Sequence, residues 1–270
     1  MPELPEVETV VTTLRPHVVG KVVRRVQLLR PDMLHPPEVT LSSRLIGQEI
    51  VTLSRRGKRI VFKMGDGNQF YIHLGMSGSL KAHAPGDARV KHTHLIVDVG
   101  RIQIRFVDPR RFGGIFWIGT STTSDDLLGP EPLTVRAAAL SKKIVASRRA
   151  IKSVLLDQAV LAGMGNIYAD EALFVATIHP TTLACNLSIT DINLLTRAIK
   201  RVLRKAIRHR GSTLRDYRDA NGETGGFQML HNVYARQDKP CRTCKSTIVR
   251  IVVGGRSTHF CPKCQPGGSR

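Results

Sequence analysis

The first residues of the chain carry the groups best suited to covalent chemistry. The sequence opens Met-Pro-Glu-Leu-Pro-Glu, and removal of Met1 ahead of Pro2 leaves a secondary amine at the new N-terminus. An α-amino group has an ordinary pKa of about 7.7 to 8.0, against about 10.4 for lysine, so a sizeable fraction is neutral and nucleophilic at cellular pH. Its attack on an aldehyde-level carbon gives a cationic iminium. Pro2 is therefore a candidate nucleophile, with Glu3 and Glu6 as neighbouring proton-transfer groups.

The same residues also admit a structural interpretation. Pro5 suits the first turn of a helix, and the nearby glutamates favour the positive end of that helix. Apolar residues recur at helical spacing at Val7, Val10, Val11 and Leu14. They predict an amphipathic helix over residues 5–14 that anchors the N-terminus, and this role is compatible with the chemical one.

Four of the five cysteines have the spacing of a metal site. Two residues separate Cys241 from Cys244 and also Cys261 from Cys264, and sixteen residues lie between the two pairs. Two such turns supply four thiolates for a tetrahedral Zn²⁺ shell that leaves no position open for a substrate. We expect one structural zinc ion in a β-hairpin finger and no organic cofactor, with a redox or disulfide role as the alternative. The remaining Cys185 is expected to be a small core residue.

The charge balance indicates a polyanionic partner. The 270 residues include 41 Lys plus Arg and 21 Asp plus Glu, which gives a net charge of +20. Nucleic acid is the expected ligand, although ribosomal and regulatory proteins share this signature with enzymes. The chain has no run of about 18 apolar residues and no signal-peptide pattern. We therefore expect a soluble cytoplasmic protein with no membrane partner.

The hydrophobic pattern divides the chain into sections. Short β-rich segments punctuated by turn signals predict an antiparallel sandwich or barrel in the first half. These segments are residues 21–29, 59–64, 70–73, 94–99 and 102–107. A stretch rich in Ser, Thr, Asp, Gly and Pro at 119–132 is expected to be a linker. Helices are then expected at 150–162 and 167–176, followed by a long one capped by Thr190 and Asp191.

The long helix is strongly basic opposite its apolar face. Its cations are Arg197, Lys200, Arg201, Arg204, Lys205, Arg208 and Arg210. A solvated outer face is the ordinary interpretation of such residues.

Four further segments combine turn residues with groups that bind phosphates or bases. A glycine-rich turn at 163–165 leads into a helix with Asn166 at its start, where it is expected to act as cap and phosphate ligand, and open backbone N–H groups there favour phosphate. A basic turn that begins at Arg55 and ends at Arg59 contains Lys58. Segments 73–79 and 108–113 place Met76 and Phe112 among turn-forming or charged residues. A core position is the ordinary alternative for both, but apolar wedges beside an arginine also suit the hole left by an extruded base.

Together these features resemble the bacterial formamidopyrimidine-DNA glycosylase family. The resemblance rests on the N-terminal motif, Lys58, Asn166 and the four paired cysteines, and it covers all sections of the chain. Leu4 stands where the sister family, endonuclease VIII, typically has glycine, which favours the purine-lesion branch.

The resemblance implies an α+β multidomain fold with DNA bound between its parts. It consists of an N-terminal catalytic antiparallel β-sandwich domain over 1–120, a helical helix-two-turn-helix DNA-binding domain over 133–225, and a C-terminal β-hairpin zinc finger over 235–270. Repair of damaged double-stranded DNA by a monomer in the bacterial cytoplasm, at the nucleoid, is implied as well.

The implied activity is that of a bifunctional DNA glycosylase and AP lyase acting on 8-oxoguanine and formamidopyrimidines. Pro2 attacks C1′ of the flipped nucleotide, and β- and δ-eliminations through the iminium then cut both sides of the sugar. The implied catalytic residues are Pro2, Glu3, Glu6 and Lys58.

The resemblance also implies a set of DNA contacts: His73, Met76, Arg110, Arg111, Phe112, Lys152, Asn166 and Arg256. Met76 and Phe112 intercalate, and Arg110 recognises the cytosine opposite the lesion. Lys152 lies near the lesion, with a snorkelling surface lysine as the alternative. The loop at 211–230 folds over the extruded base, with a disordered linker as the alternative. A non-catalytic zinc-ribbon protein that binds nucleic acid remains the rival function, but it leaves Pro2 and its glutamates unexplained.

Overall fold

The computed structural model describes residues 1–120 and 127–267. The chain divides into two units, Met1–Asp126 with His209–Gly226 and Leu127–Arg208 with Phe227–Arg270. The segment after the long helix therefore belongs with the N-terminal half of the chain. Part of the linker expected at 119–132, residues 121–126, lies outside the described residues.

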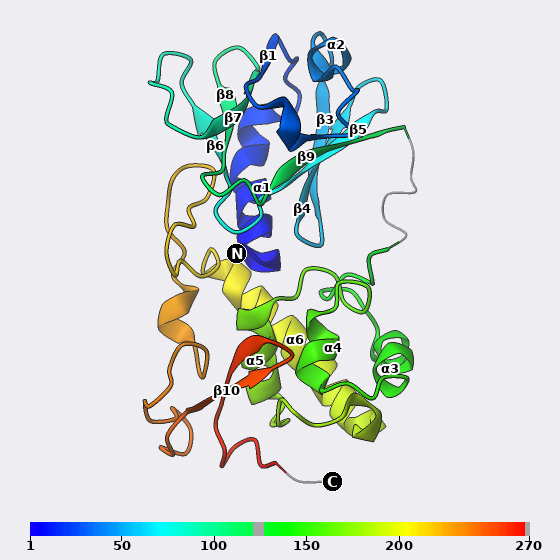
Figure 1. Ribbon diagram of the computed structural model, residues 1–270, viewed down its shortest axis with the longest axis vertical. Helices are drawn as coiled ribbons and strands as arrows, with labels where there is room; N and C mark the ends of the chain where they lie inside the picture. Colours follow the sequence, from blue (N-terminus) through cyan, green and yellow to red (C-terminus); the bar gives the residue numbers. More distant parts are fainter. Residues whose placement is uncertain (121–126, 268–270) are drawn as a thin grey trace. The chain divides into compact units, whose positions relative to one another are not determined.

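The first unit begins with helix α1, Leu4–Val18. The backbone N–H of Glu3 donates to the Glu6 carboxylate over 2.8 Å, which satisfies a donor that the helix itself leaves unpaired. The apolar residues expected on one face are all buried, and the helix continues one turn beyond the expected end. The N-terminus is thus anchored by a packed helix (Figure 1).

Two sheets form the body of this unit among the described residues. One has the order β1-β7-β8-β6, and its strands are Arg25–Leu28, Thr93–Asp98, Gln103–Val107 and Ser79–His83. The other has the order β2-β9-β5-β4-β3, with strands Leu34–His35, Gly114–Gly119, Gln69–His73, Arg59–Met64 and Ile50–Arg56. Only the short β2–β9 pairing is parallel within the described residues. The expected antiparallel sandwich is therefore confirmed.

A single hydrophobic core joins both sheets to α1. It contains Phe62 and Phe70 of one sheet, whose rings stack with centroids 4.6 Å apart, and Phe106 of the other. Val10 and Leu14 of α1 belong to the same core. Smaller pieces at the edge are the 3₁₀ helix η1, Pro31–Met33, and helix α2, Leu41–Leu45. Strands β2, β3, β6 and β9, and helix α2, were not among the expected elements.

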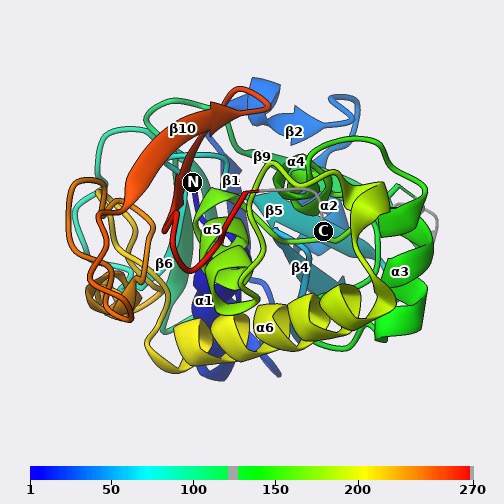
Figure 2. The same cartoon turned by 90° about the horizontal axis from the view of Figure 1, so that it is seen from below.

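The second unit is helical with a β-hairpin. Its helices are α3 (Ala137–Val145), α4 (Ile151–Leu156), α5 (Asn166–Val175) and α6 (Ile189–Arg208), with 3₁₀ turns η3 (Ala184–Asn186) and η4 (Phe227–Leu230). Figures 1 and 2 show α5 between α6 on one side and the hairpin on the other. The hairpin pairs β10, Val249–Val253, with β11, Arg256–Phe260.

Two helical expectations need correction. The helix expected over 150–162 ends at Leu156, because the Asp157 carboxylate and the Gln158 amide bind nearby backbone N–H groups instead. Helix α6 is capped by Ser188, whose hydroxyl accepts from the Asp191 N–H while Asp191 accepts from the Ser188 N–H. Among the described residues, no helix is long and apolar enough to span a bilayer.

Candidate active site and metal centre

The N-terminal residues expected to do chemistry are buried and lie around one carboxylate. Pro2 is buried, and Glu3 and Glu6 are 3% and 1% exposed. One oxygen of Glu6 accepts the Glu3 N–H, and the other accepts the N–H of Ser212 over 2.7 Å. Glu6 therefore joins the start of the chain to a segment 206 residues away.

That segment is the first part of the loop expected to cover a lesion base. Gly211 has φ +76°, and a Cβ there would lie 2.6 Å from the Glu6 carboxylate, so only glycine suits this approach. The Tyr217 hydroxyl donates to the Glu6 carbonyl oxygen over 3.2 Å. Burial raises the pKa of Tyr217, as does the negative charge of Glu6, so the phenol stays protonated as a donor.

The loop is an ordered structure, which overturns the disordered-linker alternative. The side chain of Asp219 accepts from the N–H groups of Asn221 and Glu223, and it pairs with Arg210. Residues 214–216 stay exposed between the anchored positions 212 and 217. The expected loop nevertheless ends earlier than expected, because residues 227–230 form η4 in the second unit.

Lys58 lies in the tight turn between β3 and β4. Arg55 holds this turn against α1: its guanidinium pairs with Glu8 over 2.7 Å and donates to the carbonyl oxygen of Gly57 over 3.0 Å. Arg55 is only 6% exposed in this pair. The sequence placed Arg55 in a basic turn but gave no sign of its partner on α1.

His73 lies opposite Arg59 at the end of the neighbouring strand β5. Burial lowers the pKa of His73 below its ordinary 6.5, and the positive charges of Lys58 and Arg59 lower it further. Its Nδ1 accepts the N–H of Gly75 over 3.1 Å. The ring is therefore neutral at pH 7 with its proton on Nε2, where it is available as a donor.

The two apolar wedge candidates are surface residues. Met76 is 48% exposed and Phe112 is 55% exposed, so the core alternative is wrong for both. The Arg110 guanidinium lies 4.5 Å from the centroid of the Phe112 ring, in a cation–π contact. Arg111, also exposed, has φ +54° and pairs with Asp32 over 3.2 Å. An exposed pair of this kind contributes little stability and exchanges easily with a phosphate.

A buried carboxylate holds the two wedge loops in one arrangement. Asp108 is 0% exposed. One of its oxygens accepts the Ser77 hydroxyl over 2.6 Å, and the other accepts the N–H of Gly113 over 2.8 Å. Gly75 touches the same loop so closely that a Cβ would lie 2.4 Å from the Phe112 carbonyl carbon. The segment containing Met76 is thus fixed against the segment containing Phe112, a role that the sequence did not reveal for Asp108.

In the second unit, one backbone carbonyl accepts hydrogen bonds from two of the predicted residues. The carbonyl oxygen of Ser257 accepts from Lys152 Nζ over 2.8 Å and from the Asn166 amide over 2.9 Å. Arg256, the neighbouring residue, is exposed at the start of β11. Asn166 is not the expected helix cap, because Gly165 occupies that position.

Lys152 is a structural residue, which corrects the expectation of a DNA contact. It is 0% exposed and pairs with Asp170 over 2.6 Å. Its ammonium also donates to the Thr258 hydroxyl. With its hydrogen-bonding capacity used inside the protein, Lys152 fastens the hairpin to α4 and α5, and the surface-lysine alternative is wrong as well.

Glu171 on α5 is a second buried anchor that the sequence did not reveal. It is 0% exposed and accepts the backbone N–H groups of Asn232, Val233 and Tyr234 at 2.9 to 3.0 Å. These residues lead into the cysteine-rich segment, so Glu171 fixes its start.

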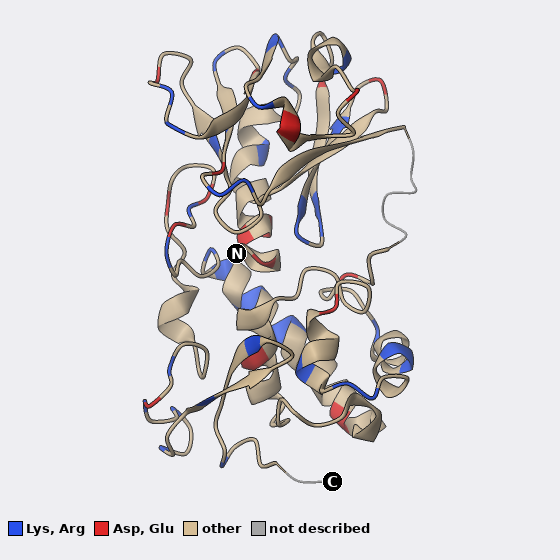
Figure 3. Cartoon of the chain, in the orientation of Figure 1, with Lys and Arg blue, Asp and Glu red and all other residues tan. Residues whose placement is uncertain are grey.

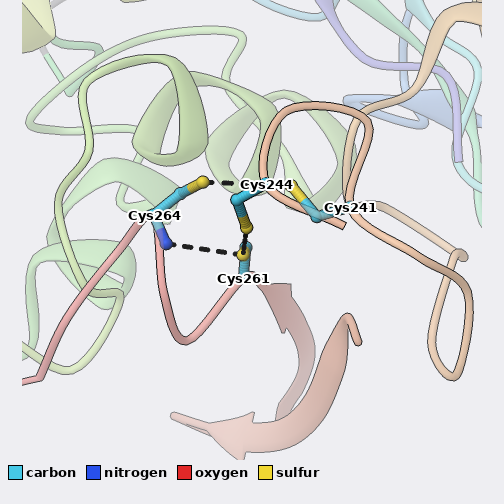
Figure 4. Close-up of side chains that lie close together, drawn as sticks. All are labelled: Cys241, Cys244, Cys261 and Cys264. Carbon is cyan, nitrogen blue, oxygen red and sulfur yellow. Dashed lines mark hydrogen bonds between the residues drawn. The ribbon is translucent and has the colours of Figure 1, made fainter. Parts of the chain in front are cut away.

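The four paired cysteines converge around one point, as Figure 4 shows. Their sulfur atoms all lie within 4.8 Å of one another. Cys244 and Cys261 have Sγ atoms 3.3 Å apart, and Cys241 and Cys264 have theirs 3.9 Å apart. A tetrahedral site with Zn–S bonds of about 2.3 Å places sulfurs about 3.8 Å apart, so the set fits zinc.

The donor chemistry agrees with that geometry. Hydrogen bonds from Ser246 lower the pKa of the Cys244 thiol to about 6, which favours the thiolate that zinc binds. Burial raises the pKa of Cys261 and of Cys264, so a bound cation is needed to hold these two as thiolates. The distances exclude disulfides, whose sulfurs lie about 2.05 Å apart. The expected structural zinc site is confirmed. Cys185, in contrast, is exposed and not the core residue expected.

The metal site generates a direct test. Cys244→Ser is expected to release zinc and to disorder the hairpin, because metal binding supplies folding free energy at a structural site. Cys185→Ser is the matched control and should keep one zinc per chain. Elemental analysis of the purified proteins checks both. Stoichiometric zinc in Cys244→Ser, or none in the unaltered protein, would contradict the assignment.

Comparison with known protein families matches three consecutive parts of the chain. The formamidopyrimidine-DNA glycosylase N-terminal domain matches residues 1–115, and the H2TH domain of the same enzyme matches residues 128–218. The zinc finger found in FPG and IleRS matches residues 238–267.

Individual relatives agree over nearly the whole chain. Formamidopyrimidine-DNA glycosylases from Carboxydothermus hydrogenoformans and Thermomicrobium roseum are 40% and 42% identical, and each alignment covers 98% of this chain and at least 99% of the relative. Lactococcus lactis Fpg, solved in a complex with abasic-site DNA, has a TM-score of 0.92 and 36% identity, with 98% of this chain and 100% of that one covered. The same identity and coverage hold for a complex of MutM with DNA containing carbocyclic 8-oxo-G, at a TM-score of 0.91. The chain therefore belongs to the formamidopyrimidine-DNA glycosylase family.

Proposed function

We propose that this chain removes 8-oxoguanine and formamidopyrimidines from duplex DNA and then cuts the abasic strand as an AP lyase. The observation that carries the proposal is the Glu6 carboxylate, which ties the Pro2–Glu3 start of the chain to Ser212 in the loop. A nucleophile and a loop able to cover a base are thereby held in one unit. Relatives solved with DNA containing N7-benzyl-Fapy-dG or 8-oxo-G support the choice of lesions.

The reaction follows from the groups at this site. Once Met1 is removed, the Pro2 nitrogen attacks C1′, and the glycosidic bond breaks with its electron pair passing to the departing base, which takes a proton. Ring opening gives a cationic iminium, whose electron demand acidifies the C2′ hydrogen. Loss of that proton expels the 3′ phosphate, and a second elimination expels the 5′ phosphate. Glu3 transfers protons at the sugar, and Glu6 positions the nucleophile and the loop.

Both cationic and neutral side chains are proposed to donate hydrogen bonds to the phosphates of the DNA backbone. We propose that Lys58 and the Nε2 proton of neutral His73 bind phosphates beside the reacting sugar. Asn166, which donates to the Ser257 carbonyl, and exposed Arg256, which precedes Ser257 in the chain, are proposed to bind further phosphates. Arg111 is proposed to exchange its surface pair with Asp32 for a phosphate.

Met76 and Phe112 are proposed to fill the hole left by the extruded base. Met76 and Phe112 are 48% and 55% exposed, they lie in two loops that Asp108 holds together, and apolar wedges of this kind compensate for unstacking. Arg110, stacked on Phe112, is proposed to read the cytosine opposite the lesion.

We propose that the chain has three functional parts. The catalytic part is 1–120, joined by the loop at 209–226. The other parts are the helix-two-turn-helix part, which ends at residue 208 and not at the expected 225, and the zinc finger over 235–270. We propose that the protein acts as a monomer on the bacterial nucleoid. A non-catalytic zinc-ribbon protein does not account for a family match over residues 1–115.

Trapping of the covalent intermediate tests the nucleophile. Borohydride should reduce the iminium and join the protein to DNA containing 8-oxoguanine opposite cytosine. Pro2→Gly should retain some trapping, because it leaves a primary amine, whereas one extra residue ahead of Pro2 should abolish trapping. Gel electrophoresis and intact mass measure the adduct. Efficient trapping by the extended protein, or Met1 retained in the active enzyme, would refute Pro2 as nucleophile.

Opposite-base preference tests the wedge loops. Arg110→Ala should flatten the preference for cytosine over adenine by about 1 to 3 kcal/mol, the discrimination that one bidentate contact supplies. Phe112→Ala should weaken lesion binding at nearly unchanged melting temperature, since the side chain is exposed. Arg111→Ala is the control, and it should weaken binding to both duplexes equally. The preference for cytosine over adenine is measured as the ratio of the single-turnover excision rates on the two duplexes. Unaltered preference in Arg110→Ala would exclude the proposed contact.

A further inference from the structure

Helix α6 presents a straight line of four arginines that the proposed reaction does not use. Arg197, Arg201, Arg204 and Arg208 follow one another at i, i+4, i+7 and i+11, so they share one face of the helix and span about 16 Å along it. All four are exposed. Lys200 and Lys205 flank them, and Figure 3 shows the resulting concentration of positive residues on α6. These four residues are called the α6 arginine stripe below.

The stripe is not neutralised by the protein. Asp191, engaged with Ser188 in the first turn, is the one acidic residue in the sequence of α6. Within residues 1–120 and 127–267, none of the four arginines forms an ion pair. Adjacent like charges on a helix destabilise it, so the fold gains nothing from this arrangement. An anionic ligand outside the chain is the physical account of such a surface.

The stripe lies away from the other DNA-binding candidates of its unit. Helix α5 packs against α6 on one side and against β11 on the other, and Figures 1 and 2 agree on this order. Asn166 and Arg256 lie on the β11 side, where Asn166 bonds to the hairpin. The buried face of α6 points toward α5 and α3, so its arginines face outward. One duplex bound at the hairpin therefore leaves the stripe accessible.

We propose that the α6 arginine stripe binds the phosphate backbone of a second, undamaged DNA duplex. Each DNA strand carries one charge per about 3.4 Å of helix axis, so a line of about 16 Å faces several phosphates. Guanidinium groups bind phosphate in a bidentate manner. Helix α6 has no aromatic residue on which unpaired bases could stack, which favours duplex over single-stranded DNA. Occupancy of both surfaces lets the protein pass directly from one DNA segment to another during its search.

The test uses the full-length protein with its lesion site already filled. A duplex carrying an abasic-site analogue is bound to saturation, and a labelled undamaged duplex is then titrated at several salt concentrations. The variant replaces the stripe with Arg197→Gln, Arg201→Gln, Arg204→Gln and Arg208→Gln. The control removes the same charge from exposed positions of the first unit, with Arg24→Gln, Arg25→Gln, Arg44→Gln and Arg101→Gln.

The unaltered protein and the control should bind the second duplex, and the affinity of the stripe variant for it should fall at least tenfold. The slope of log affinity against log salt should decrease by up to about 3.6, which is about 0.9 for each phosphate that the variant no longer binds. The stripe variant should keep or raise its melting temperature, because repulsion between like charges on α6 is removed, and it should keep its single-turnover excision rate. Release of the first duplex should accelerate with added undamaged duplex in the unaltered protein and not in the stripe variant.

Three results would overturn the inference. The first is that the saturated protein binds no second duplex. The second is that the affinity of the control for the second duplex falls as far as that of the stripe variant. The third is that the stripe binds polyglutamate but not duplex DNA, which would indicate an acidic protein as its ligand. None of these three results depends on excision activity, because the first duplex occupies the lesion site without being cut. Absence of excision in the unaltered protein would instead count against the proposed function.

Discussion

The buried carboxylate of Glu6 is the interaction on which the arrangement of the active site depends. It accepts two backbone N–H groups, from Glu3 and Ser212, and so joins two distant parts of the chain within the first unit. An unsatisfied buried donor costs about 1 to 3 kcal/mol, so removal of either bond is expensive. The position of Pro2 and the position of the loop are consequently set by the same two oxygens.

Several other acidic residues of the protein are also buried and accept hydrogen bonds that fix a segment of the chain. The chain has 21 acidic residues against 41 basic ones. Among the acids that the structure describes, five are 1% exposed or less: Glu6, Asp108, Asp170, Glu171 and Asp219. Each accepts hydrogen bonds that fix a loop or a hairpin: the lesion loop, the wedge loops, the zinc hairpin or the segment that leads to it. Buried carboxylates thus position the functional segments, while the excess of cations stays on the surface for a polyanion.

The sequence was a good guide wherever the signal is local. Cysteine spacing, the apolar face of α1 and the β-rich segment that forms β4 each depend on neighbours in the chain, and all were predicted. Resemblance to the family added the functional residues. The roles of Asp108 and Glu171 depend on partners brought close only by folding, and no spacing rule identifies them. The burial of Lys152 was missed for the same reason, since Asp170 and Thr258 belong to other elements.

The arrangement of the active site requires Glu6 to hold both segments together. Its most direct test is amide hydrogen exchange, measured by NMR, at Glu3 and Ser212 in Glu6→Gln, alongside single-turnover excision and with exposed Glu38→Gln as control. A glutamine offers one acceptor oxygen where two donors converge, so exchange should rise at one or both amides, excision should fall, and the control should match the unaltered protein. Abolished excision with both amides still protected would contradict the account, because Glu6 would then act in proton transfer alone.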